Sequence, residues 1–139
     1  MVKIINHINI DGLLQDVRRS NGKTVEVGFF DAKNATKAAY NEYGTDKIPS
    51  RPFMRTAIKK NSKSWGDKCG KAMKAMIQGM PSEQVAELLA MQMKADFSKS
   101  LVSGGWTPNA PATVRAKGSS RPLVDTGEMR ADINYRIKK

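Results

Sequence analysis

The sequence predicts an α+β fold, a small and mostly antiparallel sheet flanked by helices. Residues 24–30 and 131–138 alternate apolar and polar side chains, which is typical of half-buried strands. The segments between them place apolar residues three and four positions apart, as amphipathic helices do. A chain of 139 residues can bury one hydrophobic core, so we expect residues 1–139 to form a single domain.

The individual elements follow from these spacings and from residues that start and stop helices. Asn9 or Asp11 can cap the first helix, Gly44 ends an alanine-rich helix, and Pro52 suits the first turn of another. The helix that begins at residues 81–83 is expected to be the longest. In chain order, we expect a strand at 2–6, a helix at 10–19, a strand at 24–30, a helix at 32–43, helical segments opening at 51 and spanning 65–78, a helix that begins at 81–83 and is broken by 103–105, and a strand at 131–138.

Residues 103–121 show neither the strand period nor the helix period. They contain prolines at 108 and 111 and glycines at 104, 105 and 118. This composition favours a loop over a regular element. We therefore expect a long proline-containing loop or arm before the C-terminal strand, which becomes ordered on contact with a partner.

The chain is strongly basic, with a formal net charge of +11. Most of the excess falls between Lys47 and Lys74, where Asp67 is the only acidic residue. Residues 81–96 carry more acidic than basic side chains. A surface with separated charges suits nucleic-acid binding and head-to-tail contact between copies equally.

The ionisable residues form no catalytic or metal-binding pattern. His7 is the only histidine and Cys69 the only cysteine, so a zinc site cannot be built from them. We expect Cys69 to be buried as a small apolar residue of the helix at 65–78. No glycine-rich phosphate loop or Ser-His-Asp arrangement occurs. We therefore expect no enzyme activity, no cofactor and no metal.

Cysteine usage and hydropathy bear on location. A lone cysteine cannot form an internal disulfide, which suits a reducing compartment. No run approaches the roughly 18 apolar residues of a membrane span, and residues 1–12 are too polar for a signal peptide. We expect the chain to be made and used in the cytosol, with no membrane contact.

Two blocks of the sequence occur together in a known family. The first is NEYGTDKIPSRPFMRTAIKKN at 41–61, and the second is KGSSRPLVDTGEMRADINYRI at 117–137, approached through Trp106-Thr107-Pro108 and Thr113-Val114. Over nearly the whole chain, these blocks and the preceding VEVGF strand resemble the bacteriophage tail-completion or neck family of minor tail proteins (lambda protein Z-like, head-tail joining). The chain departs from that pattern at residues 109–111.

The resemblance implies a structural virion protein with a tail-terminator-like fold. Such a protein assembles in the host cytoplasm as a hexameric ring at the head-proximal end of the tail, completing the tail and joining it to the head. The implied partners are further copies of the chain, a tail terminator or tail tube protein, a head-closure or connector protein and, transiently, genomic DNA in the lumen. The positions expected at subunit or partner interfaces are Glu42, Gly44, Pro49, Arg51, Pro52, Phe53, Trp106, Lys117, Pro122, Leu123, Asp125, Thr126 and Gly127.

The first block has a physical rationale as a contact surface. Pro49 and Pro52 restrict the backbone before binding, and Arg51 offers a planar fork for a carboxylate or carbonyl oxygen of a neighbouring subunit. Phe53 and Met54 are candidate apolar anchors. We expect at least one of these two to pack within its own subunit.

The leading alternative is a DNA-binding accessory protein that uses the basic surface at 47–74. Only 6% of the residues are aromatic, so few side chains are available for base stacking, which favours the structural hypothesis. A hydrolase based on Cys69 is the third hypothesis.

Overall fold

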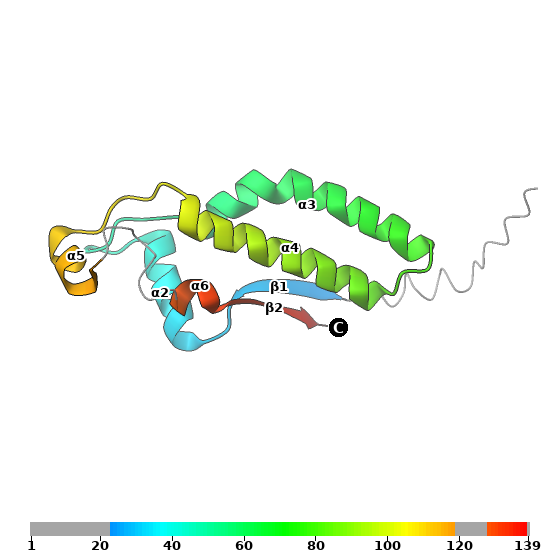
Figure 1. Ribbon diagram of the computed structural model, residues 1–139, viewed down its shortest axis with the longest axis horizontal. Coiled ribbons are helices and arrows are strands. Elements are labelled where there is room, and N and C mark those ends of the chain that lie inside the picture. The colour runs from blue at the N-terminus through cyan, green and yellow to red at the C-terminus, as the bar shows by residue number, and fades with distance from the viewer. Residues whose placement is uncertain (1–22, 119–127, 139) are drawn as a thin grey trace, which may run out of the picture.

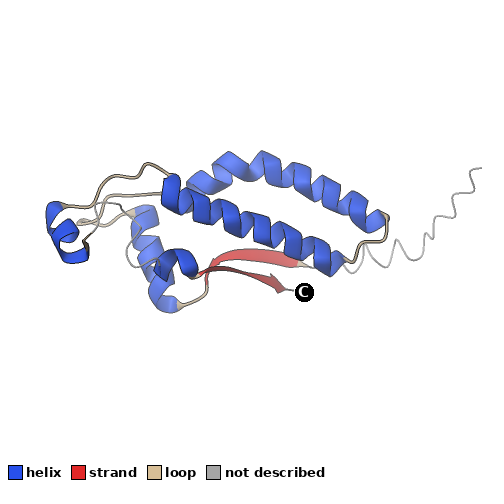
Figure 2. Ribbon diagram, in the orientation of Figure 1, coloured by secondary structure: helices blue, strands red, loops and turns tan. Residues whose placement is uncertain are grey.

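The computed structural model describes residues 23–118 and 128–138, and these residues have the expected α+β fold (Figure 1). The predicted strand at 2–6 and helix at 10–19 lie outside the described residues. Helices pack against a two-stranded antiparallel sheet, as Figure 2 shows. The elements are β1 (Thr24–Phe29), α2 (Ala32–Tyr43), α3 (Phe53–Ile77), α4 (Ser82–Ser103), α5 (Pro111–Lys117), α6 (Glu128–Ala131) and β2 (Ile133–Lys138).

The two strands that the alternation predicted pair with each other. Phe29 lies opposite Ile133, and Val27 lies opposite Tyr135, so these side chains share one face of the sheet. That face contacts α4. The other face is polar, and on it Lys138 donates a 2.7 Å hydrogen bond to Glu26. The sheet thus has one face in the core and one toward solvent, as period-two alternation requires.

The core lies where α4 passes between α3 and the sheet (Figure 1). Phe53 of α3 meets Phe29 of β1 edge to face, with ring centroids 6.2 Å apart. The Trp65 indole lies 5.6 Å from the Phe97 ring and donates a 2.7 Å hydrogen bond to Asp96. The buried cluster contains Ala38, Phe53, Ala57, Phe97, Leu101 and Ile133.

The two helical segments predicted at 51 and at 65–78 are one helix, α3. Its 25 residues make it longer than α4, which has 22, so the expectation that the helix after 81 is the longest was wrong. The connecting residues 59–64, KKNSKS, contain neither proline nor glycine, and lysine is a good helix former. None of the helices in the described ranges is long and apolar enough to cross a membrane.

The expected arm contains a helix that the sequence analysis missed. Residues 111–117 form α5, which has Pro111 in its first turn and ends at Gly118, whose φ is +68°. A proline at the start and a glycine just past the end are common helix boundaries. The arm from 104 to 118 is therefore partly helical, and residues 119–121 lie outside the described residues.

Part of the predicted apolar stripes faces solvent. Cys69 was expected to be buried and is exposed. Met73, Ile77 and Leu88 are also exposed, although they lie at the three- and four-residue spacing that is typical of a buried helix face. The C-terminal half of α3 packs on α4 along one side only. Apolar residues on its other sides therefore face solvent, although they have helical spacing.

Leu101→Ala should lower the free energy of unfolding by about 2–5 kcal/mol, because Leu101 is fully buried and its loss leaves a cavity. The same substitution at Leu88, which lies on the same helix but is 55% exposed, should lower it by less than about 1 kcal/mol. Urea unfolding of dilute protein, followed by circular dichroism, measures both values. Equal losses at the two positions would contradict the assigned core.

Candidate functional site

The loop between α2 and α3 is folded tightly on itself. It starts at Gly44, which ends α2 with a φ of +78°. A Cβ at this position would lie only 3.0 Å from the Ser50 nitrogen and 3.1 Å from the Ile48 carbonyl oxygen. The Thr45 N–H donates to the Ile48 carbonyl at 2.8 Å and closes the turn. Glycine is thus required here by both its backbone angle and the lack of space.

Glu42 supplies the missing cap of α3. The helix begins after Pro52, and no side chain at that N-cap position accepts a hydrogen bond. Instead, the Glu42 carboxylate accepts the Met54 N–H at 2.9 Å, the Arg55 N–H at 3.0 Å and the Arg55 Nε–H at 2.9 Å. Glu42 is only 4% exposed. It satisfies unpaired N–H groups of the first turn and places a negative charge at the positive end of the helix dipole.

Arg51 fastens the arm to the loop within one subunit. Its Nε donates to the Thr107 carbonyl at 2.9 Å, and its Nη2 reaches the Pro108 carbonyl at 3.4 Å and the Asn109 Oδ1 at 3.3 Å. Its Nη1 donates to the Asn41 Oδ1 at 3.0 Å. We expected this guanidinium to bind a neighbouring subunit; its acceptors belong to the same chain instead. Burial lowers the pKa of Arg51, yet arginine remains protonated in proteins.

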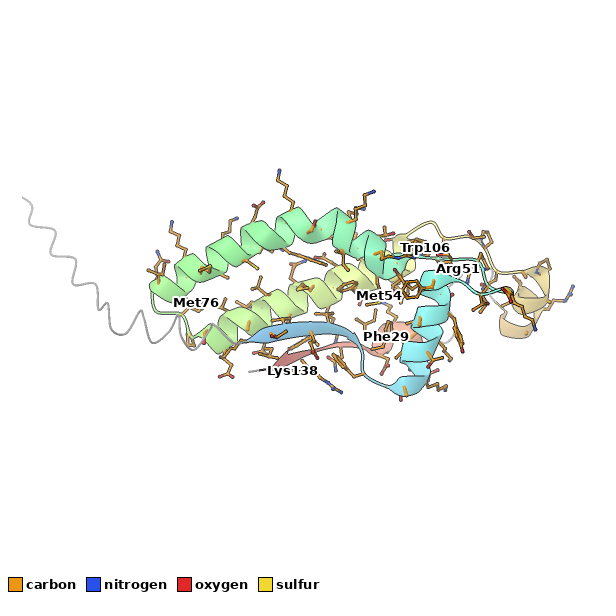
Figure 3. The ribbon with its side chains drawn as sticks, turned by 180° about the vertical axis from the view of Figure 1, so that it is seen from behind. Phe29, Arg51, Met54, Met76, Trp106 and Lys138 are labelled. Carbon is orange, nitrogen blue, oxygen red and sulfur yellow. The ribbon has the colours of Figure 1, made fainter. Side chains whose placement is uncertain are left out.

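Trp106 fixes the start of the arm. Its Nε1–H lies 3.1 Å from the Ser100 carbonyl oxygen and 3.2 Å from that of Leu101, in the last turns of α4. A Cβ at Gly104 would overlap the indole ring, so only glycine fits there. The ring also packs against the buried core. Figure 3 shows Trp106 and Arg51 at the same end of the two long helices.

The apolar residues of the first block lie mainly inside the subunit. Phe53 is fully buried in the core, and Met54 packs against that core with partial exposure. The expectation that at least one of the pair packs within its own subunit is confirmed. The buried side chains of Glu42, Arg51 and Phe53 therefore serve the fold of the subunit, and a partner would meet other atoms of this block.

The loop at 44–50 and residues 107–118 of the arm together form a projection, which we call the knob. It occupies one end of the elongated molecule (Figure 1). The knob exposes Lys47, Pro49, Pro108 and Pro111. Lys117 is the last residue of α5. The other predicted interface positions, Pro122, Leu123, Asp125, Thr126 and Gly127, lie outside the described residues.

An apolar groove of about 500 Å³ lies beside the knob, between β1, α2 and α3. Its charged lining residues are Glu26, Glu42 and Arg55. Most of the others are apolar or aromatic, namely Val27, Phe29, Phe30, Ala35, Ala38, Ala39, Tyr43, Met54 and Ile58. The Arg55 guanidinium lies 5.1 Å from the centroid of the Tyr43 ring at its rim. Such a groove can accept apolar side chains. No group of three potential metal-binding side chains occurs in the ranges that the structure describes.

Part of the basic segment at 47–74 forms one charged face of α3. The exposed lysines of α3 are Lys59, Lys60, Lys63, Lys71 and Lys74. Figure 3 shows nitrogen-tipped side chains pointing outward from α3, on the side away from α4. Asp67 is the only acidic residue of this helix. The face can attract an anionic surface, whether of a protein or of a nucleic acid.

Comparisons of the chain with protein-family models, with curated proteins and with solved structures found no match.

The sequence analysis found the residues of the first block but missed their internal roles. The Glu42 cap joins residues 12 and 13 positions apart, and the Arg51 contacts span 56 to 58 positions. Helical period and local capping patterns carry no information on such pairs. One signal was present: Pro52 cannot cap a helix with its side chain, so a buried helix start at 53 needs an acceptor from elsewhere.

Arg51→Lys should release the arm while leaving the core folded, because a lysine ammonium cannot contact the spread of acceptors that the guanidinium reaches. Amides of α5 should exchange with solvent deuterium about tenfold faster, as expected for a local loss of about 1.4 kcal/mol. Mass spectrometry of peptides covering 104–118 measures this rate. Arg130→Lys, at an exposed arginine of α6, is the matched control and should leave it unchanged. Unchanged protection in both variants would show that Arg51 does not hold the arm.

Proposed function

We propose that the chain is a structural virion protein of a long-tailed bacteriophage. In this proposal it forms a ring, hexameric by the family resemblance, at the head-proximal end of the tail, where it completes the tail and joins it to the head. Its partners are further copies of itself, a tail terminator or tail tube protein on one side and a head-closure or connector protein on the other. Genomic DNA passes through the lumen of the ring.

The observation that carries the proposal is the knob. Arg51, in the first family-like block, holds residues 107–109, on the approach to the second block, so segments far apart in sequence form one preorganised unit. A unit that is ordered before binding loses less conformational entropy when it docks. The knob projects from the core with exposed prolines and polar residues. These are properties suited to docking onto a neighbouring virion component.

The buried part and the exposed part of the first block have different tasks in this proposal. Glu42, Arg51 and Phe53 hold the shape of the knob and its base. Pro49 and the neighbouring loop residues, together with the outer side of α5, offer the contact surface. The apolar groove between β1, α2 and α3 lies next to this surface and can receive side chains from the docked partner.

Deleting residues 110–118 should leave a folded subunit but block the joining of tails to heads. The deletion spares Trp106, which packs against the core and would destabilise the subunit if removed. In the phage that encodes the chain, electron microscopy should then show full-length tails beside unattached, filled heads. Overlong tails would instead indicate a terminator role. Fully infectious particles would contradict the proposal that the knob is a joint.

Replacing residues 110–118 by a flexible Gly/Ser linker of equal length is the matched control for chain length. This variant should also fail to join tails to heads, because it lacks the α5 surface. Circular dichroism of both variants checks that the remaining helices are intact. Recovery of infectivity by the linker would show that only the length of the arm matters.

A second candidate function, DNA binding, is favoured by the lysines gathered on the outer face of α3. If this face binds duplex DNA, the logarithm of the binding constant should fall linearly with the logarithm of the salt concentration. The slope should be about −0.9 for each phosphate that the protein neutralises. Replacing Lys60 and Lys63 by glutamine should make the slope less steep by about 2, because two phosphate contacts are lost. The control replaces Lys33 and Lys37 of α2, which lie near Glu128, and should have no effect. Equal effects of the two pairs would reject a specific α3 surface.

A further inference from the structure

The outer edge of β1, the edge that faces away from β2, is open. The sheet has two strands, so β1 pairs with a neighbour along one edge only. Alternate residues of an antiparallel strand point their N–H and C=O groups away from the partner strand. Within the described residues, no backbone hydrogen bond reaches this outer edge from another element. Such an edge can pair with a strand of another chain.

The apolar groove beside the knob runs along this open edge. Residues 26–30 all line the groove, whereas none of its described lining residues belongs to β2. Successive side chains of a strand point to opposite faces, so a groove that touches consecutive residues lies at the edge of the strand. Figure 3 shows two of the lining residues, Phe29 at the end of β1 and Met54 at the start of α3. Unpaired backbone groups and an apolar lining thus occur together.

The core-facing side chains of β1 are incompletely covered. Val27 and Phe29 share the sheet face that contacts α4, yet both are only half-buried, and both line the groove. A strand that added to β1 would cover them further. Strand addition needs backbone groups for hydrogen bonds and pockets for every second side chain. The edge of β1 and the groove supply both.

Residues 2–6 of the chain, VKIIN, have the pattern that this site would receive. Val2 and Ile4 alternate with Lys3 and Ile5, and the segment contains neither proline nor glycine. The groove does not oppose an apolar segment, because its charges are already paired. Glu42 accepts a hydrogen bond from Arg55, and Glu26 accepts one from Lys138. An added strand can therefore place Val2 and Ile4 in the groove without leaving a charge unpaired.

A neighbouring copy is the better source of this strand. If a chain placed its own residues 2–6 beside β1, the helix predicted at 10–19 would connect the two strands and pack on a face of the sheet. One face already contacts α4, and the other carries Glu26 and Lys138. Neither face can cover the apolar side of that helix, which includes Leu13 and Val17. The same segment of another copy meets no such constraint.

Residues 7–22 are long enough to connect two copies. With the helix predicted at 10–19, these residues extend over about 35 Å. This is about the length of α4, which has 22 residues. Residues 2–6 can thus reach beyond the subunit to which they belong.

We propose that residues 2–6 of one copy add to the outer edge of β1 of the next copy as a third strand, with Val2 and Ile4 in its groove. The inserted segment and the receiving groove are different surfaces, so the contact is head-to-tail and repeats from copy to copy. The contact rests on the proposed ring for its closed form. It names the parts by which neighbouring subunits of that ring meet.

The test uses full-length variants that each lack one half of the contact. Wild-type protein should form oligomers larger than a dimer, measured by light scattering coupled to gel filtration. Ile4→Asp removes the inserted side chain, and Ala39→Glu fills the groove from an exposed position of α2. Each variant should be monomeric. Mixed in equal amounts, they should form dimers and nothing larger, because the segment of the second variant fits the groove of the first.

The matched controls place the same charges one position further along. Ile5→Asp changes a side chain that alternates to the opposite side of the added strand. Tyr40→Glu changes an exposed residue of α2 that does not line the groove. Both controls should assemble like the wild type. Ile4→Gln and Ala39→Gln repeat the experiment if a charged variant does not fold, which circular dichroism checks.

Hydrogen exchange tests whether the contact is a strand. Amides of residues 24–29 should exchange more slowly in the wild-type oligomer than in the Ile4→Asp monomer, because an added strand pairs with the outer edge of β1. Equal exchange in the two proteins would overturn strand addition. Wild-type protein that remains monomeric at its highest soluble concentration would overturn the contact between copies. A mixture of the two variants that stays monomeric, or that forms oligomers as large as the wild type, would overturn it too.

The outcomes also separate this contact from the proposed function. Oligomers that survive both substitutions, in a phage whose tails still require the chain to join heads, would overturn the contact alone. Dimers formed as expected, in a phage that assembles normally without the chain, would support the contact and overturn the joining function alone.

Discussion

The Glu42 carboxylate at the start of α3 is the interaction on which the rest of this structure depends. It sits at the end of α2 and satisfies two backbone N–H groups of the next helix, so it fixes how these two helices meet. That junction sets the position of Phe53 in the core. It also sets the position of Arg51, which directly precedes Pro52. A buried charge is favourable only when it is paired and hydrogen-bonded, and here a helix terminus and Arg55 provide both.

The core and the exposed surfaces follow from this arrangement. α3 begins at the junction and runs along α4, but only its first half also has β1 and α2 as neighbours. Its second half continues beyond them with one packing partner, which leaves Met73 and Ile77 in solvent. The same geometry exposes the lysines of α3. Exposed basic and apolar side chains therefore lie close together on α3. A mixed surface of this kind suits contact with another protein better than a uniformly charged surface would.

Much of the fold could be predicted because it is encoded locally. The alternation at 24–30 and 131–138 found both strands of the described residues, although the second begins only at Ile133 because Ala131 belongs to α6. The alanine-rich segment before Gly44 found α2 with its observed bounds. Burial could not be predicted in the same way. The helical period places Cys69 beside other apolar residues, but whether that side meets a partner depends on how far α3 extends past the sheet. α5 was missed because Pro108 and Pro111 were interpreted as loop residues, although Pro111 occupies the first turn of the helix. The role of Arg51 depends on a contact with residues more than fifty positions away.

Arg51 holds the arm largely through main-chain oxygens, those of Thr107 and Pro108. Carbonyl groups are common to all amino acids, so of the three contacts to the arm only the one to the Asn109 Oδ1 depends on the side chain at its position. Residues of the arm can consequently diverge while the arm keeps its attachment point. The attachment of the arm by Arg51 is thus separate from the arm residues that would contact a partner. This separation would allow related chains to bind different partners with the same subunit fold.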